Sequence, residues 1–278
     1  MPRKIFVTGG TGYLGSHVVQ HLVETGHDVT VMTRSHLPTK PVWWLGVKSI
    51  QVPDIREVTT DQWQQFLPHH DLVVHLAWDV EPGKYLHSKT NQEYADATLK
   101  MALVVQELAI PRFVGVGTCL EYRPKNAPLE VDDPVDPSSL YAECKLNTCN
   151  KLRQLFTASG TQFAWARVFF LYGGDEKPQR LGGYLHQQLR QALPVKLTSG
   201  IQIRDYLPVD VAGTNIAKLA LSNYCGVANI CSGNATTVRE LAESIADLYG
   251  RRDFLQFGAL PDNPNEIPMI VGRKTEFS

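Results

Sequence analysis

Three glycines spaced three residues apart, near the start of the chain, constrain its fold more than any other feature. They are Gly9, Gly12 and Gly15, and they stand between an apolar β-type run at 4–8 and a helical pattern at 16–25. A strand that turns directly into a helix needs glycine where the backbone turns sharply and where helix and strand pack closely. The segment therefore predicts a strand, a tight loop and a helix in immediate succession.

The same loop is suited to bind phosphate. The first turn of a helix presents unpaired N–H groups and the positive end of the helix dipole. Where glycine lets the backbone come close, a pyrophosphate can be held there, as in dinucleotide-binding folds. We therefore expect a bound dinucleotide to contact Gly9, Gly12, Tyr13, Leu14 and Gly15.

β-type runs and helical patterns alternate along most of the chain, which predicts an α/β fold: a doubly wound parallel (Rossmann) sheet with helices on both faces. Further strands are expected at 28–33, 49–52, 71–77, 112–117 and 162–171, and helices at 91–108 and 140–156. Beyond Tyr172 the pattern loosens, although Thr237 and Glu240 form a capping box that opens a helix. We predict a dinucleotide-binding domain at 1–165 and a smaller substrate-binding C-terminal lobe at 166–278, partly interleaved with it.

Composition excludes several classes of partner. Of the 278 residues, Lys and Arg total 27 and Asp and Glu 28, so the net charge of −1 offers no field for nucleic acid or an anionic membrane. No apolar run approaches the roughly 20 residues that cross a bilayer, and the N-terminus lacks a signal-peptide profile. The five cysteines include no C-x-x-C pair, so neither a zinc site nor a disulfide framework is expected. We predict a cytoplasmic protein that holds no metal.

Further motifs follow the glycine loop in order: Asp54-Ile55, His75-Leu76-Ala77, Tyr141-x-x-x-Lys145, Arg204-Asp205-Tyr206 and Asn229-Ile230-Cys231-Ser232-Gly233. Together with the T-G-x-x-G-x-x-G spacing, this set resembles the extended short-chain dehydrogenases/reductases, the NAD(P)-dependent nucleotide-sugar epimerase/dehydratase family. The resemblance implies that Asp54 and Ile55 contact the adenine and that Leu76 and Ala77 line the dinucleotide site. It also implies a homodimer formed through the helix at 91–108 and the helix that carries Tyr141.

The end of the second predicted strand bears on the choice of dinucleotide. NAD-specific members of such folds usually carry an acid there, which accepts from the ribose 2′-hydroxyl. This chain has Thr33, Arg34 and Ser35 instead. A guanidinium can bind a 2′-phosphate in bidentate fashion, and hydroxyls can donate to it. NADP(H) is therefore preferred and NAD(H) remains possible; in the alternative, Arg34 only stacks on the adenine or points into solvent.

Tyr141 and Lys145 lie four residues apart, so they share one face of a helix. A free phenol has a pKa of about 10, and a nearby ammonium is expected to lower it, making Tyr141 a usable general acid or base. Thr118 follows a strand end, where α/β sheets present their ligand sites, and lies four residues before Tyr122. The resemblance implies that Thr118 hydrogen-bonds the reacting oxygen and that Lys145 also binds the nicotinamide ribose.

Departures from the family's pattern reduce the range of reactions expected of this chain. The 4,6-dehydratases carry an acidic pair where this chain has Cys119 and Leu120, so sugar dehydration is disfavoured. Glu121 does not replace that pair, because on an extended chain its side chain would face the side opposite that of Leu120. Phe170 replaces an Asn that contacts the substrate diphosphate in relatives. Arg204 remains available for a phosphate, or it pairs with Asp205 or Asp210 in a structural role. Five residues are thus candidates for substrate contact: Trp78, Cys119, Glu121, Phe170 and Arg204.

These features predict an NADP(H)-dependent oxidoreductase that reduces the 4-keto group of a nucleotide-linked 6-deoxyhexose. The catalytic residues would be Thr118, Tyr141 and Lys145. An NAD-dependent nucleotide-sugar 4-epimerase is the alternative enzyme. A dinucleotide-sensing binding module with a silent site is the alternative outside enzymes.

Overall fold

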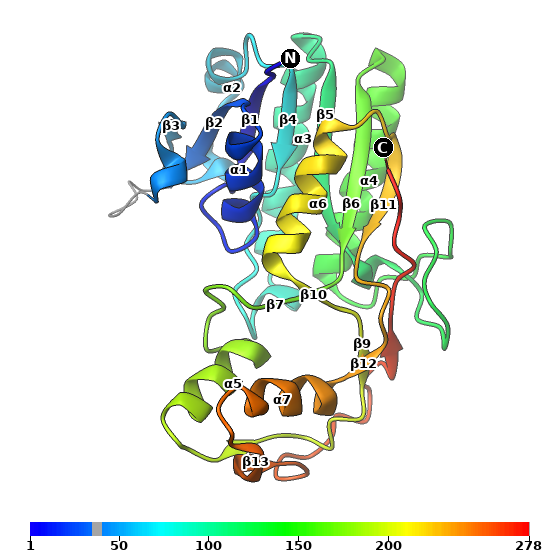
Figure 1. Ribbon diagram of the computed structural model, residues 1–278. Helices are drawn as coiled ribbons and strands as arrows, with labels where there is room; N and C mark the ends of the chain where they lie inside the picture. Colours follow the sequence, from blue (N-terminus) through cyan, green and yellow to red (C-terminus); the bar gives the residue numbers. More distant parts are fainter. Residues whose placement is uncertain (35–40, 278) are drawn as a thin grey trace.

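The computed structural model of the protein describes residues 1–34 and 41–277. Its centre is a seven-stranded sheet in the order β11-β6-β5-β4-β1-β2-β3, and every neighbouring pair in it is parallel (Figure 1). The strands of this sheet are β1 (Lys4–Thr8), β2 (Asp28–Thr33), β3 (Lys48–Gln51), β4 (Leu72–His75), β5 (Arg112–Thr118), β6 (Gln162–Val168) and β11 (Gly226–Ile230). The predicted doubly wound α/β fold is confirmed.

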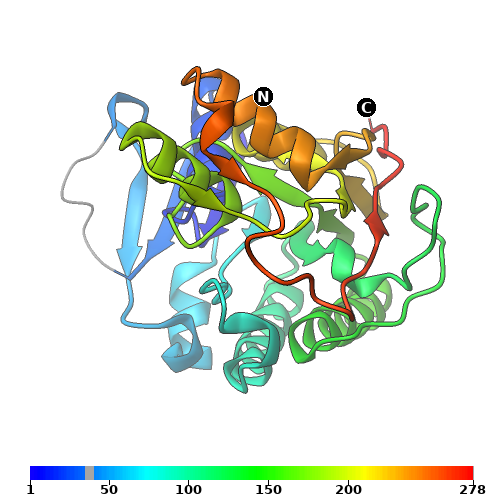
Figure 2. The ribbon, with the colours of Figure 1, turned by 90° about the horizontal axis from the view of Figure 1, so that it is seen from below.

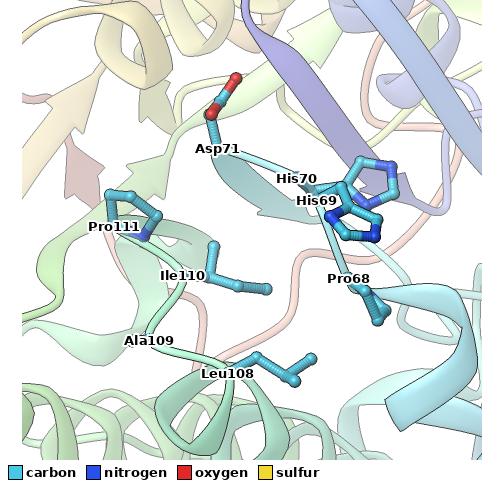
Figure 3. A pocket seen from close by; sticks show the side chains of 8 residues that line it. All are labelled: Pro68, His69, His70, Asp71, Leu108, Ala109, Ile110 and Pro111. Carbon is cyan, nitrogen blue, oxygen red and sulfur yellow. The ribbon is translucent and has the colours of Figure 1, made fainter.

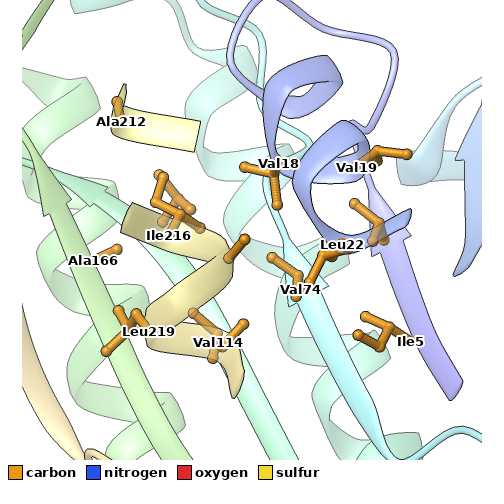
Figure 4. Packing of buried hydrophobic residues seen from close by; sticks show 14 of the residues in the cluster. Ile5, Val18, Val19, Leu22, Val74, Val114, Ala166, Ala212, Ile216 and Leu219 are labelled. Carbon is orange, nitrogen blue, oxygen red and sulfur yellow. The ribbon is translucent and has the colours of Figure 1, made fainter. Parts of the chain in front are cut away.

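Helices cover both faces of the sheet, because successive strand residues point to opposite sides and both sides are apolar. Ile5 and Val7 pack toward one face and Phe6 toward the other. The helices of this domain are α1 (Gly15–Glu24), α2 (Thr60–Phe66), α3 (Thr90–Glu107), α4 (Leu140–Ser159) and α6 (Val209–Leu221). Helices α1 and α6 share one core, in which Val18 and Ile216 lie against β4 and β5 (Figure 4).

The C-terminal part forms a smaller lobe below the sheet, at the end where the strands point (Figures 1 and 2). Its helices α5 (Leu181–Arg190) and α7 (Val238–Asp247) share a core that includes Leu185 and Leu241. The predicted capping box of Thr237 and Glu240 opens α7. Short strands complete the lobe: β7 (Phe170–Tyr172), β8 (Val195–Lys196), β9 (Ile203–Arg204), β10 (Tyr206–Pro208), β12 (Thr236–Thr237), β13 (Leu255–Gln256) and β14 (Met269–Ile270).

The predicted division at residue 165 falls inside β6 rather than between elements. After α5 the chain returns to the large sheet as α6 and β11, so the C-terminal part contributes to both bodies. The predicted strand at 162–171 is in fact two strands, β6 and β7, that belong to different sheets. Among residues 1–34 and 41–277, no helix is both long enough and apolar enough to cross a bilayer.

A buried hydrogen-bond chain centred on His75 joins the ends of β1 and β4 to α3. The Thr98 hydroxyl donates to the Tyr94 carbonyl at 2.7 Å, so it must accept from His75 Nε2–H, which lies 2.8 Å away. His75 Nδ1 then accepts from the Thr8 hydroxyl at 2.7 Å, and Thr8 Oγ1 accepts from Ala77 N–H at 3.3 Å. The imidazole is therefore neutral, and it fixes the backbone that follows β4.

We expect His75→Gln to flatten the acid side of the stability profile. Burial lowers the pKa of His75 from 6.5 to about 3. Between pH 3 and pH 6.5, the unfolded chain therefore binds a proton at this residue that the folded protein does not bind. The free energy of unfolding therefore falls as pH drops from 6.5 toward 3, with about 1.4 kcal/mol per pH unit from this group. Urea denaturation at several pH values measures the slope. Thr98→Val loses the same hydrogen bond but keeps the imidazole, and an equal flattening in that variant would contradict the assignment.

Candidate functional site

The glycine loop lies between β1 and α1, beside the residues that follow β4. Gly9 has a φ of +70°, and Gly12 N–H donates to Gly9 O at 3.0 Å, which closes the turn. A Cβ on Gly9 would stand 2.7 Å from Ala77 N, and one on Gly15 would overlap the Gly9 carbonyl. Both positions therefore require glycine. Leu76 and Ala77 accordingly flank the loop.

Tyr13 joins this loop to the C-terminal lobe. Its hydroxyl donates to the Gly173 carbonyl at 2.8 Å, and the Arg180 guanidinium lies 5.4 Å from its ring centre. Burial, with Glu176 nearby, raises the pKa of Tyr13 above its usual value. The segment between β7 and α5 thus lies against the glycine loop and closes one side of the site. The sequence contains no signal for this contact, because it joins residues 160 positions apart.

The expected adenine end of the site brings Arg34 close to Asp54. Thr33 is the buried last residue of β2, Arg34 is exposed, and Ser35 lies outside the described residues. Asp54 caps the 3₁₀ helix η2 (Ile55–Glu57) and is paired with Arg56 at 2.9 Å. The hydrogen bond from Arg56 lowers the pKa of Asp54 most, and the charge of Arg34 acts in the same direction. Ile55 is buried beneath this pair.

The three predicted catalytic residues are placed by β5 and α4. Thr118 ends β5, and its hydroxyl accepts from Leu120 N–H at 3.3 Å at the start of η4 (Cys119–Glu121). Tyr141 and Lys145 lie in the first turns of α4, and both are buried. Lys145 Nζ donates to the Val116 carbonyl of β5 at 2.7 Å, which ties α4 to the strand that carries Thr118.

The pKa of Tyr141 is raised, not lowered. Burial is the largest cause, and Tyr85, whose ring centre lies 4.8 Å from that of Tyr141, adds to it. Lys145 does not offset this, because its Nζ lies 5.9 Å from the Tyr141 ring centre and points to Val116. The expectation that the ammonium lowers the phenol's pKa is therefore wrong. Burial also lowers the pKa of Lys145 to about 7.

Glu121 is a structural carboxylate and not an exposed substrate contact. It is fully buried, and it accepts from Thr118 N–H at 2.9 Å, Trp165 Nε1–H at 3.0 Å and Arg167 Nε–H at 2.7 Å. The predicted substrate role fails because η4 turns the side chain inward beneath the strand tip. Instead, the carboxylate holds the backbone of Thr118.

The other predicted substrate residues differ in how free they are. Cys119 is buried, and burial raises its pKa to about 12. Arg204 donates to the Ile203 and Ile267 carbonyls and pairs with Glu266, so the predicted pairing with Asp205 or Asp210 is wrong. A phosphate would have to displace these contacts to reach the guanidinium. Phe170 is half-buried, with the Arg204 guanidinium 5.3 Å from its ring centre.

Trp78 lies beside Tyr141, with ring centres 6.4 Å apart. Its indole N–H donates to Asn91 Oδ1 at 2.7 Å, and its ring stacks on Tyr94 at 5.8 Å. Sequence reasoning gave no role to Arg180, whose positive charge acts on both Tyr85 and Tyr141. That residue belongs to the irregular segment before α5, where no periodic pattern marks it.

A hollow of about 340 Å³ lies away from these residues, where the chain enters β4 and β5, between His69–Asp71 and Leu108–Pro111 (Figure 3). The predicted catalytic residues follow the opposite, carboxyl ends of the strands. In open α/β sheets that carboxyl edge is where ligands bind. We therefore assign the site to the edge that carries the glycine loop and Thr118.

Glu121→Gln is expected to lower the free energy of unfolding by about 3–5 kcal/mol, because it leaves the buried Arg167 cation unpaired. Arg167 and Glu121 side chains are only 4% and 0% exposed. Glu130→Gln is the matched control, since its pair with Arg273 is exposed and is expected to contribute less than about 1 kcal/mol. Urea denaturation of both variants measures the difference. Equal losses would show that the buried pair has no special role.

Comparisons with known proteins agree with the fold. The chain is 27% identical to a putative UDP-glucose 4-epimerase of Methanocaldococcus jannaschii, over 94% of this chain and 86% of that protein. It is 24% identical to the dTDP-6-deoxy-L-talose 4-dehydrogenase (NAD(+)) of Aggregatibacter actinomycetemcomitans, over 98% of this chain and 100% of that protein. The fold matches Thermus thermophilus UDP-glucose 4-epimerase in complex with NAD, with a TM-score of 0.80, 21% identity and coverage of 98% and 90%.

The family model for the NAD dependent epimerase/dehydratase family matches residues 5–223, which is most of the chain. That match begins in β1 and ends just beyond α6, so it includes the glycine loop and all three predicted catalytic residues. The resemblance expected from the ordered motifs is confirmed. The chain belongs to the NAD dependent epimerase/dehydratase family.

Proposed function

We propose that this protein is an NADP(H)-dependent oxidoreductase that reduces the 4-keto group of a nucleotide-linked 6-deoxyhexose. The observation that carries the proposal is the placement of Tyr141: a buried, protonated phenol in the first turns of α4, the helix whose Lys145 donates to β5, the strand that ends at Thr118. A reduction needs a proton donor at the carbonyl oxygen, and a protonated phenol can supply that proton, although the raised pKa makes Tyr141 a weaker acid than a free tyrosine.

When bound, the dinucleotide supplies a hydride to the keto carbon. The glycine loop binds its pyrophosphate through backbone N–H groups at the start of α1. The Thr118 hydroxyl, which already accepts from Leu120 N–H, donates its own proton in a hydrogen bond to the keto oxygen. Tyr141 transfers its proton to that oxygen as the carbonyl becomes an alcohol, and the phenolate that remains is reprotonated through solvent.

A nucleotide-sugar 4-epimerase is the second candidate, and the Methanocaldococcus relative with that name favours it. An epimerase first removes a proton from the substrate hydroxyl, which requires a base. The raised pKa of Tyr141 opposes this first step, and it equally disfavours the phenolate that a reduction leaves, so it does not separate the two reactions. Cys119 and Leu120 supply no acid/base pair for a 4,6-dehydration. A silent dinucleotide-sensing module is the remaining alternative, and the grouping of Thr118, Tyr141 and Lys145 argues against it.

The preference for NADP(H) rests on Arg34, an exposed cation at the end of β2 where no carboxylate stands. The family, the Aggregatibacter dehydrogenase and the Thermus epimerase structure are described with NAD, so NAD(H) is the alternative. The homodimer and the cytoplasmic location stay predictions. Helices α3 and α4 lie side by side, and Leu103 on α3 is 55% exposed, which supports an interface on this face.

Tyr141→Phe is expected to reduce turnover about 10²–10⁴-fold while dinucleotide affinity stays unchanged, because the proton donor is lost and the ring is kept. Loss of NADPH absorbance with a nucleoside-diphosphate 4-keto-6-deoxyhexose measures turnover, and calorimetry measures affinity. Tyr249→Phe, in the C-terminal lobe, is the control. Full turnover by Tyr141→Phe would remove this residue from the mechanism. Interconversion of C4 epimers by the wild type without net NADPH loss would establish the epimerase instead.

Arg34→Ala is expected to weaken NADPH binding about tenfold and to leave NADH binding unchanged, because only NADPH carries a 2′-phosphate that the guanidinium can bind. Calorimetric titration with each dinucleotide measures both affinities. Lys48→Ala removes another exposed cation of the same sheet and serves as the control. If wild-type protein binds NADH as tightly as NADPH, the proposed preference is wrong.

A further inference from the structure

Lys145 is a buried cation whose surroundings contain little compensating charge. Its side chain is 3% exposed, and its ammonium donates to one carbonyl, Val116 O, at 2.7 Å. Among residues 1–34 and 41–277, no carboxylate forms an ion pair with it. A buried ammonium without a counter-charge tends to lose its proton. The fraction of Lys145 that stays charged therefore depends on whichever neighbouring group favours the ammonium.

Of the aromatic rings around Lys145, the indole ring of Trp78 lies nearest to the ammonium and can favour its charged form. Lys145 Nζ lies 3.8 Å from the centre of the Trp78 ring, whereas the Tyr141 and Trp165 ring centres are 5.9 Å and 6.0 Å away. Tryptophan offers the strongest cation–π partner among the aromatic side chains, and the attraction grows when water is excluded. Both conditions are met here, since Lys145 is almost fully buried.

Trp78 is itself held in one orientation. Its indole N–H donates to Asn91 Oδ1 at 2.7 Å. The Asn91 amide then donates to the Tyr85 carbonyl at 2.6 Å and the Ser88 carbonyl at 2.8 Å, so every polar group of this buried amide is used. Rotation of the indole would break the bond to Asn91 and the stack on Tyr94.

We propose that Trp78 is a positioning residue for Lys145: its indole face favours the charged form of the ammonium and holds it in place, and Asn91 fixes the indole. The proposal rests on the proposed function only in giving Lys145 a role beside Tyr141.

Three other titratable groups face Lys145. Tyr141 lies on the same helix, and burial keeps it a neutral phenol. His75, at the end of β4, is neutral because burial lowers its pKa to about 3. Glu121, on η4, favours the charged lysine, although its carboxylate is paired with Arg167. Trp78 also contacts the ring of Tyr141, which stays a neutral phenol, so a fall in the Lys145 midpoint in a Trp78 variant reports the loss of the indole face.

The ionisation of Lys145 can be measured without any turnover, by following the ε-carbon signal of ¹³C-labelled lysine against pH. A Lys145→Met variant identifies the signal by its loss. We expect the midpoint to fall by about one pH unit in Trp78→Leu and to fall by less in Trp78→Phe, which keeps an aromatic face. Trp44→Leu is the control, because it shrinks another buried indole whose N–H has no partner among the described residues.

An unchanged midpoint in Trp78→Leu would overturn the proposal. A higher midpoint would also overturn it, because it would show that Trp78 serves to exclude water. If Trp78→Leu does not fold, Asn91→Leu keeps the indole but removes its anchor, and it is expected to lower the midpoint in the same direction. An unchanged midpoint in Asn91→Leu would then be decisive against the proposal. Failure of the proposed function would be seen separately. The wild-type protein would then show no turnover, while the Lys145 midpoint would still depend on Trp78.

Discussion

The buried polar side chains at the carboxyl edge of the sheet need hydrogen-bond or ion-pair partners within the protein, because helices cover both faces of the seven strands. Taking a charge or a polar group out of water is costly unless a partner is supplied. Glu121, His75 and Lys145 meet this requirement in three different ways. Each solution also fixes a part of the backbone that forms the site.

Glu121 is compensated by a full charge, Arg167, and in return its carboxylate holds the backbone N–H of Thr118. His75 avoids charge altogether and bridges Thr8 and Thr98 as a neutral imidazole. Lys145 has only a carbonyl and an aromatic face. One buried ion pair thus fixes the end of β5, whereas weaker contacts hold the lysine.

These pKa shifts bear on the proposed proton transfer. Burial raises the pKa of Tyr141, so the phenol stays protonated at neutral pH and is a weaker acid than a free tyrosine, while a lysine whose pKa lies at about 7 can change its charge near neutral pH. In the proposed reduction Tyr141 starts as the proton donor, and a positive charge close to its oxygen would stabilise the phenolate that the transfer leaves.

The fold, the glycine loop, the family and the element that carries each predicted catalytic residue could all be predicted from the amino-acid sequence. These depend on local spacing: glycines three apart, apolar runs of strand length, and a Tyr and Lys one helical turn apart. The partners of the charged groups could not be predicted in this way, because they depend on which distant parts of the chain pack together. Arg204 bonds to Glu266 and not to Asp205, and Glu121 turns toward Arg167, because strands far apart in sequence meet in the sheet. The same holds for the direction of the Tyr141 pKa shift, since burial depends on what the rest of the chain packs around a side chain.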